Sequence, residues 1–382
     1  MIQRFLAPLA LAMNILLTPV LAPAAALAQP VPYQIETIAE GLNHPWSIAF
    51  LPDGDMLVTE RSGQLRRISA GQLVDEPITG VPEVFEQSQG GLFDIVLDPA
   101  FEANGVVFLT YAWGASDANG TRLVRARLDG DTLVDPEILF TPNRLKNTMV
   151  HYGGRLTLLP DGTLLLAVGD GFDFREQAQV TTNHLGSFIR LNEDGSVPED
   201  NPFYGRDGVL QEIFSIGHRN PQGLVVDPVT GRIFSHEHGP AGGDELNLIE
   251  PGANYGWPIA TFGMDYDGAL VTPYTEYPGM RQPLVAWVPS IAPSGLAIYR
   301  GDMFPEWVGD IFVGALIAGD APDGIGGHVR RVDMDETVVL DQEILFAEIG
   351  ARIRDIRVAP DGSLFILTDE DHGRVLRIHR VE

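Results

Sequence analysis

Residues that can do chemistry are concentrated between positions 218 and 258 of this sequence. Four motifs there bring together a cation, imidazoles, carboxylates and turn-forming Gly and Pro: His218-Arg219-Asn220-Pro221-Gln222-Gly223, Glu237-His238-Gly239-Pro240, Gly243-Asp244-Glu245-Leu246-Asn247 and Asn254-Tyr255-Gly256-Trp257-Pro258. Almost no helix-forming pattern separates them, so we expect them on loops, where binding and catalytic residues concentrate. One motif alone could be a solvated ion pair or a turn plugged by an aromatic ring. Their clustering instead favours a functional site.

A second stretch supplies a candidate acid–base pair. His151 directly precedes Tyr152-Gly153-Gly154, and the small glycines are expected to leave its ring accessible. Asp170 ends the β-forming segment that follows, so a strand out and back would bring its carboxylate to the imidazole. Such a partner fixes the tautomer of a histidine and raises its basicity, as a general base near neutral pH requires. The alternative is a structural histidine that caps a turn.

Alternating arginines near the C-terminus indicate a possible receptor for an anion. Arg352 and Arg354 alternate in a β-forming segment, so both guanidinium groups are expected on one face, near Asp369. Arg219 offers a third cation from a distant loop. Gln89, followed by two glycines, would present an amide where a ligand can approach the backbone closely. An ordinary surface network of ion pairs is the alternative.

Charge and composition exclude several classes of partner. The formal net charge is −27, from 52 acidic and 25 basic residues, and such a surface repels phosphate backbones and anionic lipids. We therefore expect no nucleic-acid partner and no membrane insertion. Lys146 is the only lysine, and every other basic residue is an arginine, which keeps its charge and binds carboxylates bidentately. Without cysteine the fold must rest on its apolar core, and 45% of the residues are hydrophobic.

The N-terminus has the pattern of a secretory signal peptide. Arg4 precedes an apolar run over residues 5–27 that prolines interrupt, and the run ends in Ala26-Leu27-Ala28. Small residues before Gln29 fit a cleavage site, whereas the broken run is too irregular for a good spanning helix. We therefore expect residues 1–28 to be a cleaved signal peptide and the protein to be periplasmic or secreted. A lipoprotein anchor would need a cysteine.

One turn pattern recurs along the rest of the chain, and each copy precedes a short run of β-forming residues. The clear copies are Leu51-Pro52-Asp53-Gly54, Leu159-Pro160-Asp161-Gly162 and Ala359-Pro360-Asp361-Gly362, with weaker ones at Asp98, Asp227 and Pro305. About six such units without an amphipathic helix predict an all-β fold, a six-bladed β-propeller of four-stranded antiparallel blades. No linker divides residues 29–382, which we expect to form a single domain. Tyr33–Ile38 should complete the last blade and close the ring.

Together the motifs resemble a known family. The run from His218 to Pro258, Gly153-Gly154-Arg155-Leu156 after His151, and Arg352-Ile353-Arg354-Asp355 resemble the soluble PQQ-dependent sugar dehydrogenases. These are the glucose and aldose sugar dehydrogenases of the glucose/sorbosone dehydrogenase superfamily. The resemblance covers nearly the whole mature chain. It implies a six-bladed propeller outside the cytoplasm, PQQ and Ca²⁺ as cofactors, a sugar substrate and an external electron acceptor, either a cytochrome or a quinone.

The resemblance also implies roles for individual residues. His151 matches the base that takes the proton of the anomeric hydroxyl while C1 passes hydride to the quinone, and Asp170 matches its partner. PQQ carries three carboxylates, which call for several arginines; the positions that match its contacts are Gln89, Arg219, Asn220, His238, Ser290, Arg352, Arg354 and Asp369. Ca²⁺ prefers oxygen ligands. The matching groups are the carbonyls of Gly239 and Pro240 at one ion, and the Glu245 carboxylate and Tyr255 carbonyl at a second.

Some positions depart from the family pattern and keep other functions open. Ile317 stands where glucose-type members place a lysine against the quinone, an insertion follows at Gly319–Gly327, and Val150 replaces an Asp that precedes the base in some members. These changes are compatible with a propeller that binds a ligand but has lost catalysis. A metal-dependent lactonase would need several carboxylates at the channel mouth, and the sequence offers no obvious set. His236-Glu237-His238 could be a zinc-binding His-x-His, but the usual third ligands do not stand beside it.

Overall fold

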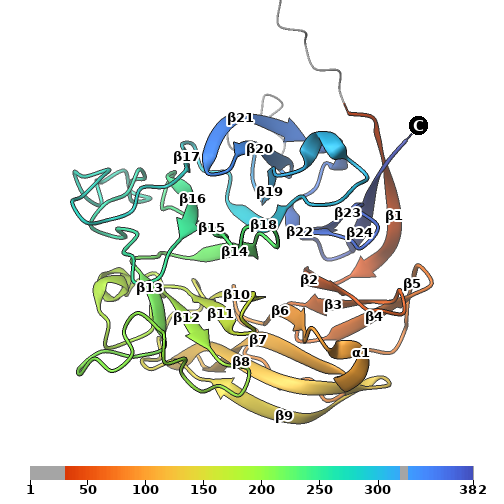
Figure 1. Ribbon diagram of the computed structural model, residues 1–382, viewed down its shortest axis with the longest axis horizontal. Helices are drawn as coiled ribbons and strands as arrows, with labels where there is room; N and C mark the ends of the chain where they lie inside the picture. The colour runs from red at the N-terminus through yellow and green to blue at the C-terminus, as the bar shows by residue number, and fades with distance from the viewer. Residues whose placement is uncertain (1–30, 319–325, 382) are drawn as a thin grey trace, which may run out of the picture. The chain divides into compact units, whose positions relative to one another are not determined.

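The computed structural model describes residues 31–318 and 326–381. The predicted signal peptide, residues 1–28, and most of the Gly319–Gly327 insertion lie outside the described residues. Six four-stranded antiparallel sheets form the blades of a ring (Figure 1). The predicted six-bladed β-propeller is therefore confirmed.

Each blade is built from strands that are consecutive in the sequence. Blade 1 contains β2 (Pro45–Phe50), β3 (Met56–Glu60), β4 (Leu65–Ser69) and β5 (Gln72–Leu73). Blade 2 contains β6 (Leu92–Leu97), β7 (Val106–Ala115), β8 (Ala118–Asp129) and β9 (Thr132–Phe140). Blade 3 contains β10 (Gly153–Leu158), β11 (Leu164–Val168), β12 (Ser187–Leu191) and β13 (Ile213–Ile216).

The second half of the ring repeats this order. Blade 4 contains β14 (Pro221–Val226), β15 (Ile233–Glu237), β16 (Asp244–Ile249) and β17 (Val285–Trp287). Blade 5 contains β18 (Pro293–Ile298), β19 (Ile311–Ala315), β20 (Val329–Asp335) and β21 (Val338–Leu345). Blade 6 contains β22 (Ile353–Val358), β23 (Leu364–Thr368), β24 (Gly373–Arg380) and the N-terminal strand β1 (Tyr33–Leu42). The first strand of each of blades 1 to 5, and β22 of blade 6, contacts its counterparts in the adjacent blades, so these six strands line the centre of the ring.

The ring closes through the pairing of the two ends of the chain. β1 runs antiparallel to β24, with Tyr33 opposite Arg380 and Leu42 opposite Gly373. The prediction that Tyr33–Ile38 completes the last blade is confirmed, and the strand extends four residues further. This pairing covers the exposed edge of β24, which would otherwise offer unpaired backbone groups to other chains.

The recurring Pro-Asp-Gly motif forms the turn between the first two strands of blades 1 and 3 and between β22 and β23. Gly54, Gly162 and Gly362 each adopt a left-handed conformation there (φ 92°, 83° and 82°), which favours glycine. In blades 3 and 6 the aspartate also anchors the turn to the third strand: Asp161 accepts a hydrogen bond from Arg190 of β12 (2.6 Å). Asp361 accepts one from Arg377 of β24 in the same way (2.6 Å). A local sequence pattern thus fixes the turn and ties it to the third strand of the blade.

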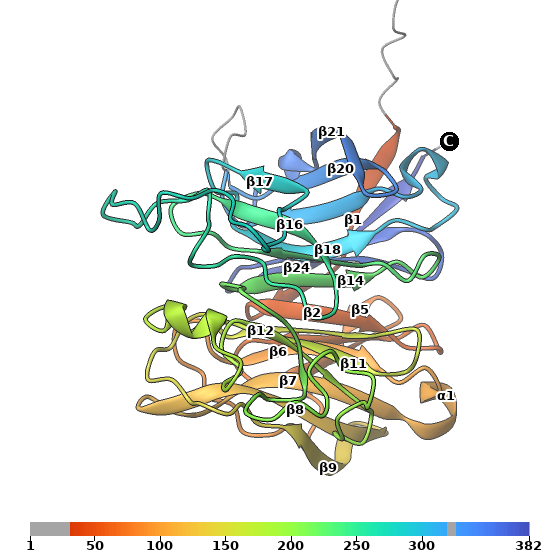
Figure 2. The ribbon, with the colours of Figure 1, turned by 60° about the vertical axis from the view of Figure 1, so that its left-hand side comes forward.

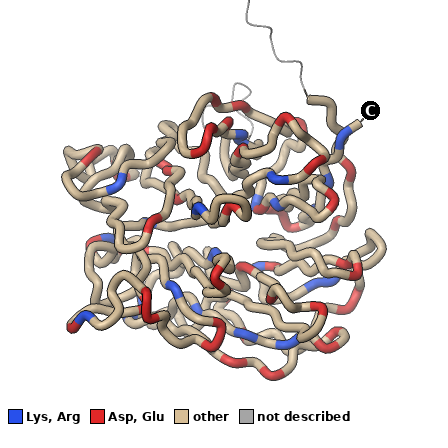
Figure 3. Tube along the Cα trace, in the orientation of Figure 1, with Lys and Arg blue, Asp and Glu red and all other residues tan. Residues whose placement is uncertain are grey.

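Neighbouring blades pack face to face (Figure 2), and buried apolar clusters that combine residues of two blades fill the spaces between them. Leu57 and Leu65 of blade 1, for example, share one buried cluster with Ile95 and Val107 of blade 2. Helices contribute little to the described residues: they are α1 (Phe101–Asn104) and the 3₁₀ turns η1 (Arg175–Gln179), η2 (Pro305–Trp307) and η3 (Ala347–Ile349). None of these has the length and apolar character needed to cross a membrane. Acidic residues are spread around the whole ring (Figure 3).

Candidate active site

A cavity of about 230 Å³ opens where the central strands begin, and residues of all six blades or their loops line it. We call it the arginine cavity; its lining is Trp46, Arg61, Gln89, Phe93, Tyr152, Gly153, Asn220, Gln222, His238, Ala292, Leu316, Arg352, Arg354 and Asp369. Six predicted cofactor contacts therefore meet here, namely Gln89, Asn220, His238, Arg352, Arg354 and Asp369. The lining carries three arginines and one aspartate in a chain whose net charge is −27. Such a local excess of cations suits an anionic ligand.

The two alternating arginines converge on one carboxylate, as the strand alternation predicts. Arg354 donates to Asp369 at 2.7 Å, and Arg352 donates to the same oxygen at 3.3 Å. His44 contacts the other carboxylate oxygen at 2.9 Å. Burial alone would raise the pKa of Asp369, but Arg354, His44 and Arg352 together hold it well below its usual range. Asp369 thus stays ionised and orients both guanidinium groups toward the cavity wall.

His151 and Asp170 form a buried pair. His151 Nδ1 lies 2.7 Å from Asp170 Oδ1, and the same oxygen accepts the Phe172 N–H at 2.8 Å. The indole N–H of Trp257 donates to Oδ2 at 2.7 Å. Burial would raise the pKa of Asp170, but its hydrogen bond to His151 lowers it, so the carboxylate is ionised. Because an ionised carboxylate only accepts hydrogen bonds, the proton of the ring sits on Nδ1 and Nε2 carries the lone pair.

The His151 backbone is held in an uncommon conformation. Its φ is 54°, its N–H donates to the Gln89 side chain (2.8 Å), and Asn220 holds the following Gly153 N–H (3.1 Å). Gly169 allows the close approach of β11, because a Cβ there would lie 2.3 Å from the His151 carbonyl oxygen. The prediction of an accessible ring is wrong: His151 is only 5% exposed. The ring of Phe172 packs against it edge-on, with centroids 5.1 Å apart.

Burial also sets the protonation state of His151. It lowers the pKa of the imidazole, while the hydrogen bond and charge of Asp170 act in the opposite direction. The net shift is downward, so the ring is neutral near pH 7. A neutral ring whose Nε2 carries the lone pair is the state that a general base requires.

A second cavity is lined by Phe172 and Trp257, which contact His151 and Asp170. Its volume is about 280 Å³, and its lining is Phe172, Asp173, Arg175, Glu176, Arg219, Trp257, Asp265 and Tyr266. Phe172 stacks on Tyr266 with centroids 6.3 Å apart, and Arg175 bridges to Asp265 at 3.0 Å. Two loops distant in the sequence thus meet in front of the His151–Asp170 pair.

Arg219 is buried and borders two cavities. The backbone N–H of Arg219 donates to the Glu237 carboxylate. Its guanidinium donates to the carbonyls of His238 (3.1 Å) and Gly239 (2.5 Å). It lines the second cavity and a third, smaller one, but not the arginine cavity. The structure therefore brings Arg219 to the Gly239 carbonyl, one of the predicted metal ligands, rather than beside Arg352 and Arg354.

The predicted carboxylate of the second metal site lines this third cavity, the glutamate cavity, of about 10 Å³. Its lining is Arg219, Glu237, His238, Gly239, Gly243, Glu245, Tyr255, Trp257, Ala260 and Thr261. Removal from water and the neighbouring Glu237 raise the pKa of Glu245 to about 8. In the part of the chain that the structure describes, Asn247 Oδ1 nearby is buried without a hydrogen-bond partner. Two close carboxylates, a free amide oxygen and space for one small particle fit a single cation.

Ser290, a predicted PQQ contact, and Pro240, a predicted metal ligand, lie apart from these cavities. The Ser290 hydroxyl donates to Asp244 at 2.6 Å, and neither Ser290 nor Pro240 lines the arginine cavity or the glutamate cavity. Ile317 is 40% exposed, while the preceding Leu316 lines the arginine cavity and accepts a hydrogen bond from Arg352 (3.2 Å). The position that differs from the lysine of glucose-type members thus adjoins the arginine cavity.

His236 and His238 form hydrogen bonds with backbone carbonyls of blade 5. His236 Nε2 lies 3.2 Å from the Gly295 carbonyl oxygen, and His238 Nε2 lies 2.7 Å from that of Pro293. Burial lowers the pKa of His236 to about 3. Within residues 31–318 and 326–381, no three His, Asp or Glu side chains are grouped so as to hold a metal ion. A cation in the glutamate cavity would therefore depend on carbonyl and amide oxygens as well.

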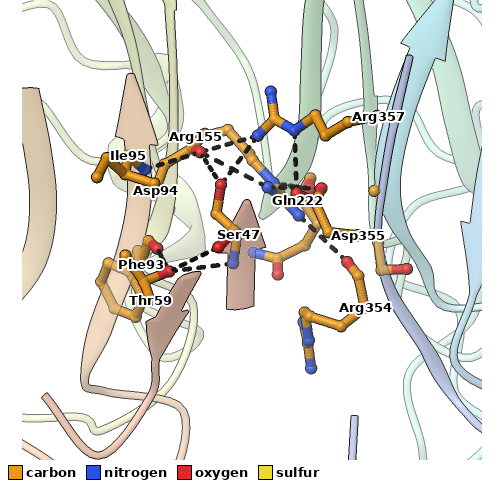
Figure 4. A network of polar contacts seen from close by, with 12 residues as sticks. Ser47, Thr59, Phe93, Asp94, Ile95, Arg155, Gln222, Arg354, Asp355 and Arg357 are labelled. Atoms are coloured by element: carbon orange, nitrogen blue, oxygen red, sulfur yellow. Dashed lines mark hydrogen bonds and ion pairs between the residues drawn. The ribbon is translucent and has the colours of Figure 1, made fainter. Parts of the chain in front are cut away.

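Sequence reasoning missed a charged network in the centre of the ring (Figure 4). Arg155 reaches Asp355 at 3.0 Å, and Arg357 bridges Asp355 (2.9 Å) and Asp94 (2.8 Å). Ser47 donates to Asp94 at 2.6 Å. These residues come from the central strands of blades 1, 2, 3 and 6, and two cations balance two anions. The only signal in the sequence was the presence of charged residues within otherwise apolar strands.

The fold and these residues define a class: a six-bladed propeller with a cation-rich cavity beside a buried His–Asp pair. Residues 42–377 match the Glucose / Sorbosone dehydrogenase family. The chain belongs to this family, as the sequence motifs predicted.

Named relatives share both sequence and fold. An aldose sugar dehydrogenase of Escherichia coli is 39% identical over 369 residues, which cover 95% of this chain and 97% of that protein. The crystal structure of the soluble E. coli enzyme in its apo form aligns with a TM-score of 0.86 and 37% identity over 91% of this chain and 100% of that one. The PQQ-bound aldose sugar dehydrogenase of Streptomyces coelicolor aligns with a TM-score of 0.72 and 29% identity over 92% and 100%.

Proposed function

We propose that this protein is an exported quinoprotein that oxidises aldose sugars at C1 to lactones, with PQQ as the hydride acceptor and His151 as the general base. The observation that carries the proposal is the buried His151–Asp170 pair next to loops that line a cation-rich cavity. Membership of the family, and the activities after which its relatives are named, support the substrate class. The partners are a small sugar and an external electron acceptor, a cytochrome or a quinone.

His151 would take the proton of the anomeric hydroxyl on Nε2. Asp170 keeps Nδ1 protonated and stabilises the imidazolium that forms. Trp257 and the Phe172 N–H hold the carboxylate in place, so the imidazole cannot turn away from the substrate. With the hydroxyl proton on His151 and the C1 hydrogen leaving as hydride, the sugar carbon becomes the lactone carbonyl.

The arginine cavity would hold the cofactor. PQQ is planar and carries three carboxylates, and it supplies the two-electron acceptor that no amino-acid side chain provides. Arg352 and Arg354 are the candidate carboxylate partners, with Gln89, Asn220 and His238 as neutral contacts. The PQQ-bound form of the S. coelicolor relative supports PQQ as the cofactor. Asp369, which lines the same cavity, belongs to the proposed set, whereas Arg219 and Ser290 lie outside the lining of this cavity.

We assign Ca²⁺ to the neighbouring carbonyls and carboxylates. The Gly239 and Pro240 carbonyls are the candidates for one ion; neither lines the arginine cavity, and Arg219 would have to release the Gly239 carbonyl for an ion to bind there. Glu245 and the Tyr255 carbonyl are the candidates for a second ion. The proximity of Glu237 to Glu245 supports the second site. Burial and, after it, the charge of Glu237 raise the pKa of Glu245, and a divalent cation would offset both effects.

The test is a spectroscopic titration of PQQ into purified protein with Ca²⁺, followed by addition of an aldose. We expect saturable binding and a change to the spectrum of the reduced cofactor, and His151→Ala should bind PQQ but be reduced far more slowly. Failure to bind PQQ refutes the proposal. Binding of PQQ without its reduction by any aldose would favour the alternative function, a propeller that binds a ligand but has lost catalysis, with which Ile317 is compatible.

A further inference from the structure

The only lysine of the chain is buried behind the His151–Asp170 pair. Lys146 is 2% exposed, although a lysine side chain is almost never fully buried without partners. It lies in the segment between β9 and β10, five residues before His151. Every other basic residue is an arginine, so this position combines an unusual residue type with an unusual location.

The ammonium group of Lys146 has a complete set of partners. Nζ donates to Asn119 Oδ1 at 3.0 Å and to the Thr148 carbonyl at 2.7 Å. It also lies 3.4 Å from the centroid of the Tyr152 ring, within the range of a strong cation–π contact. Asn119 and Lys146 exchange both backbone hydrogen bonds as well (2.8 and 2.9 Å). These contacts anchor Lys146 to β8 of blade 2.

The same contacts hold both ends of the segment that carries His151. At one end, the Thr148 hydroxyl donates to the Gly171 carbonyl at 2.6 Å, directly after Asp170. At the other end, the Tyr152 hydroxyl donates to Asn119 Oδ1 at 2.8 Å. His151 lies between these two anchors in its left-handed conformation. The side-chain stem of Lys146 also packs on Gly171, where an added Cβ would lie 2.7 Å from Lys146 Cδ.

We propose that Lys146 is a positioning residue that fixes the segment carrying His151 and whose charge tunes the His151–Asp170 pair. The structural part rests on the contacts alone, and the catalytic part rests on the proposed function. Four titratable or charged groups face Lys146 or belong to or face the His151–Asp170 pair: Asp170, His151, Tyr152 and Arg219. Burial raises the pKa of the Tyr152 phenol well above its ordinary value, so this ring stays neutral.

The sign of the effect follows from these neighbours. Burial lowers the pKa of Lys146 to about 7, while the charge of Asp170 acts in the opposite direction. When protonated, Lys146 lowers the pKa of His151. Replacement by an uncharged residue should therefore raise the pKa of His151. Only the neutral ring accepts a proton. On acidification, the variant should therefore begin to lose activity at a higher pH than the wild type.

The first test reads Lys146 directly and needs neither cofactor nor substrate. Protein labelled with ¹³C-lysine gives a single Cε signal, whose shift against pH reports the ionisation of Lys146 in the wild type and in Asp170→Asn. We expect a midpoint near 7 in the wild type and a lower one in the variant, which has lost the attracting carboxylate. A midpoint at the ordinary lysine value of about 10.4, or one that Asp170→Asn leaves unchanged, would overturn the proposal whatever the function of the protein.

The second test compares pH profiles of kcat/KM for Lys146→Met and Tyr152→Phe. Lys146→Met removes the charge at similar length, whereas Tyr152→Phe removes only the hydroxyl that anchors the segment to Asn119. We expect the acid limb of Lys146→Met to move to higher pH, with a difference from the wild type that narrows above pH 8. Tyr152→Phe should lose activity equally at all pH values. An equal, pH-independent loss in both variants would refute the electrostatic role, and if Lys146→Met does not fold, the labelling experiment still decides.

Discussion

Arg354 is the residue on which the cofactor assignment can be tested most sharply. Its side chain is 14% exposed and donates to Asp369 at 2.7 Å, whereas that of Arg352 is 48% exposed and lies 3.3 Å from the same oxygen. Both line the arginine cavity. If the cavity holds a trianionic cofactor, the two arginines should contribute unequally, because the buried guanidinium is less screened by water.

The expected magnitude follows from burial. Removing one arm of a buried, charge-assisted pair costs about 2–5 kcal/mol, and about 1.4 kcal/mol corresponds to a factor of ten. Arg354→Ala also leaves Asp369 with less cationic screening beside the ligand, and this carboxylate would then repel it. We therefore expect PQQ binding to weaken by roughly 30-fold or more in Arg354→Ala. A half-exposed ion pair is worth about 0–1 kcal/mol, so Arg352→Ala should weaken binding by about fivefold or less.

The assay is a titration of PQQ into each apo variant at constant Ca²⁺ and ionic strength. Arg374→Ala is the matched control, because Arg374 belongs to the same blade, pairs with Glu370 at 3.4 Å on the surface and does not line the cavity. It should bind PQQ like the wild type. A dissociation constant for Arg354→Ala within about threefold of the control, a difference of less than about 0.7 kcal/mol, would show that these arginines form an ordinary ion-pair network. The cofactor would then have to bind elsewhere.

Three further predictions concern the reaction itself. His151→Ala should keep the fold and PQQ binding but lower kcat by roughly 10²–10⁴, measured as reduction of an artificial acceptor; unchanged turnover would remove His151 from the mechanism. In Asp170→Asn the partner that raises the pKa of His151 is lost, so the acid limb of kcat/KM should move to lower pH while kcat falls, and an upward shift would contradict the assigned state of the pair. Chelation should abolish activity and Ca²⁺ should restore it; full activity in a metal-free sample, or rescue by zinc alone, would refute the calcium assignment.

The sequence was sufficient where neighbours in space are also neighbours along the chain. The hairpin of β10 and β11 pairs Gly153 with Val168, so His151 and Asp170, just beyond these strand ends, come together. Strand alternation likewise placed Arg352 and Arg354 on one face, where both reach Asp369. These are consequences of local register, which a strand pattern with recognisable turns specifies well.

Contacts across the ring could not be read from local patterns. Trp257 reaches Asp170 across 87 positions of sequence, and Arg155 reaches Asp355 only because blades 3 and 6 face the same channel. The exposure of His151 was misjudged for a related reason. Gly153 lies against the backbone of Ala167 and Gly154 against the ring of Phe93, so neither leaves open space. The ring of Phe172, which has a left-handed backbone conformation (φ 68°), packs on the imidazole of His151 itself. Which side chain fills a given space depends on loop conformations that propensity does not set.

The distribution of charge along the channel explains why an anion would bind in the arginine cavity and not at the central network of Arg155, Arg357, Asp94 and Asp355. In the central network, Arg155 and Arg357 balance Asp94 and Asp355, so this layer offers an approaching anion no net attraction. The arginine cavity has three arginines in its lining against Asp369 alone, and Arg61 there donates to a backbone carbonyl rather than to a carboxylate. A chain with a net charge of −27 thus places uncompensated cations in a cavity that blades from the whole ring enclose. Surface ion pairing would not produce this imbalance, because the acidic surface supplies partners in excess. The imbalance is therefore a physical argument for a bound polyanion that is independent of the family resemblance.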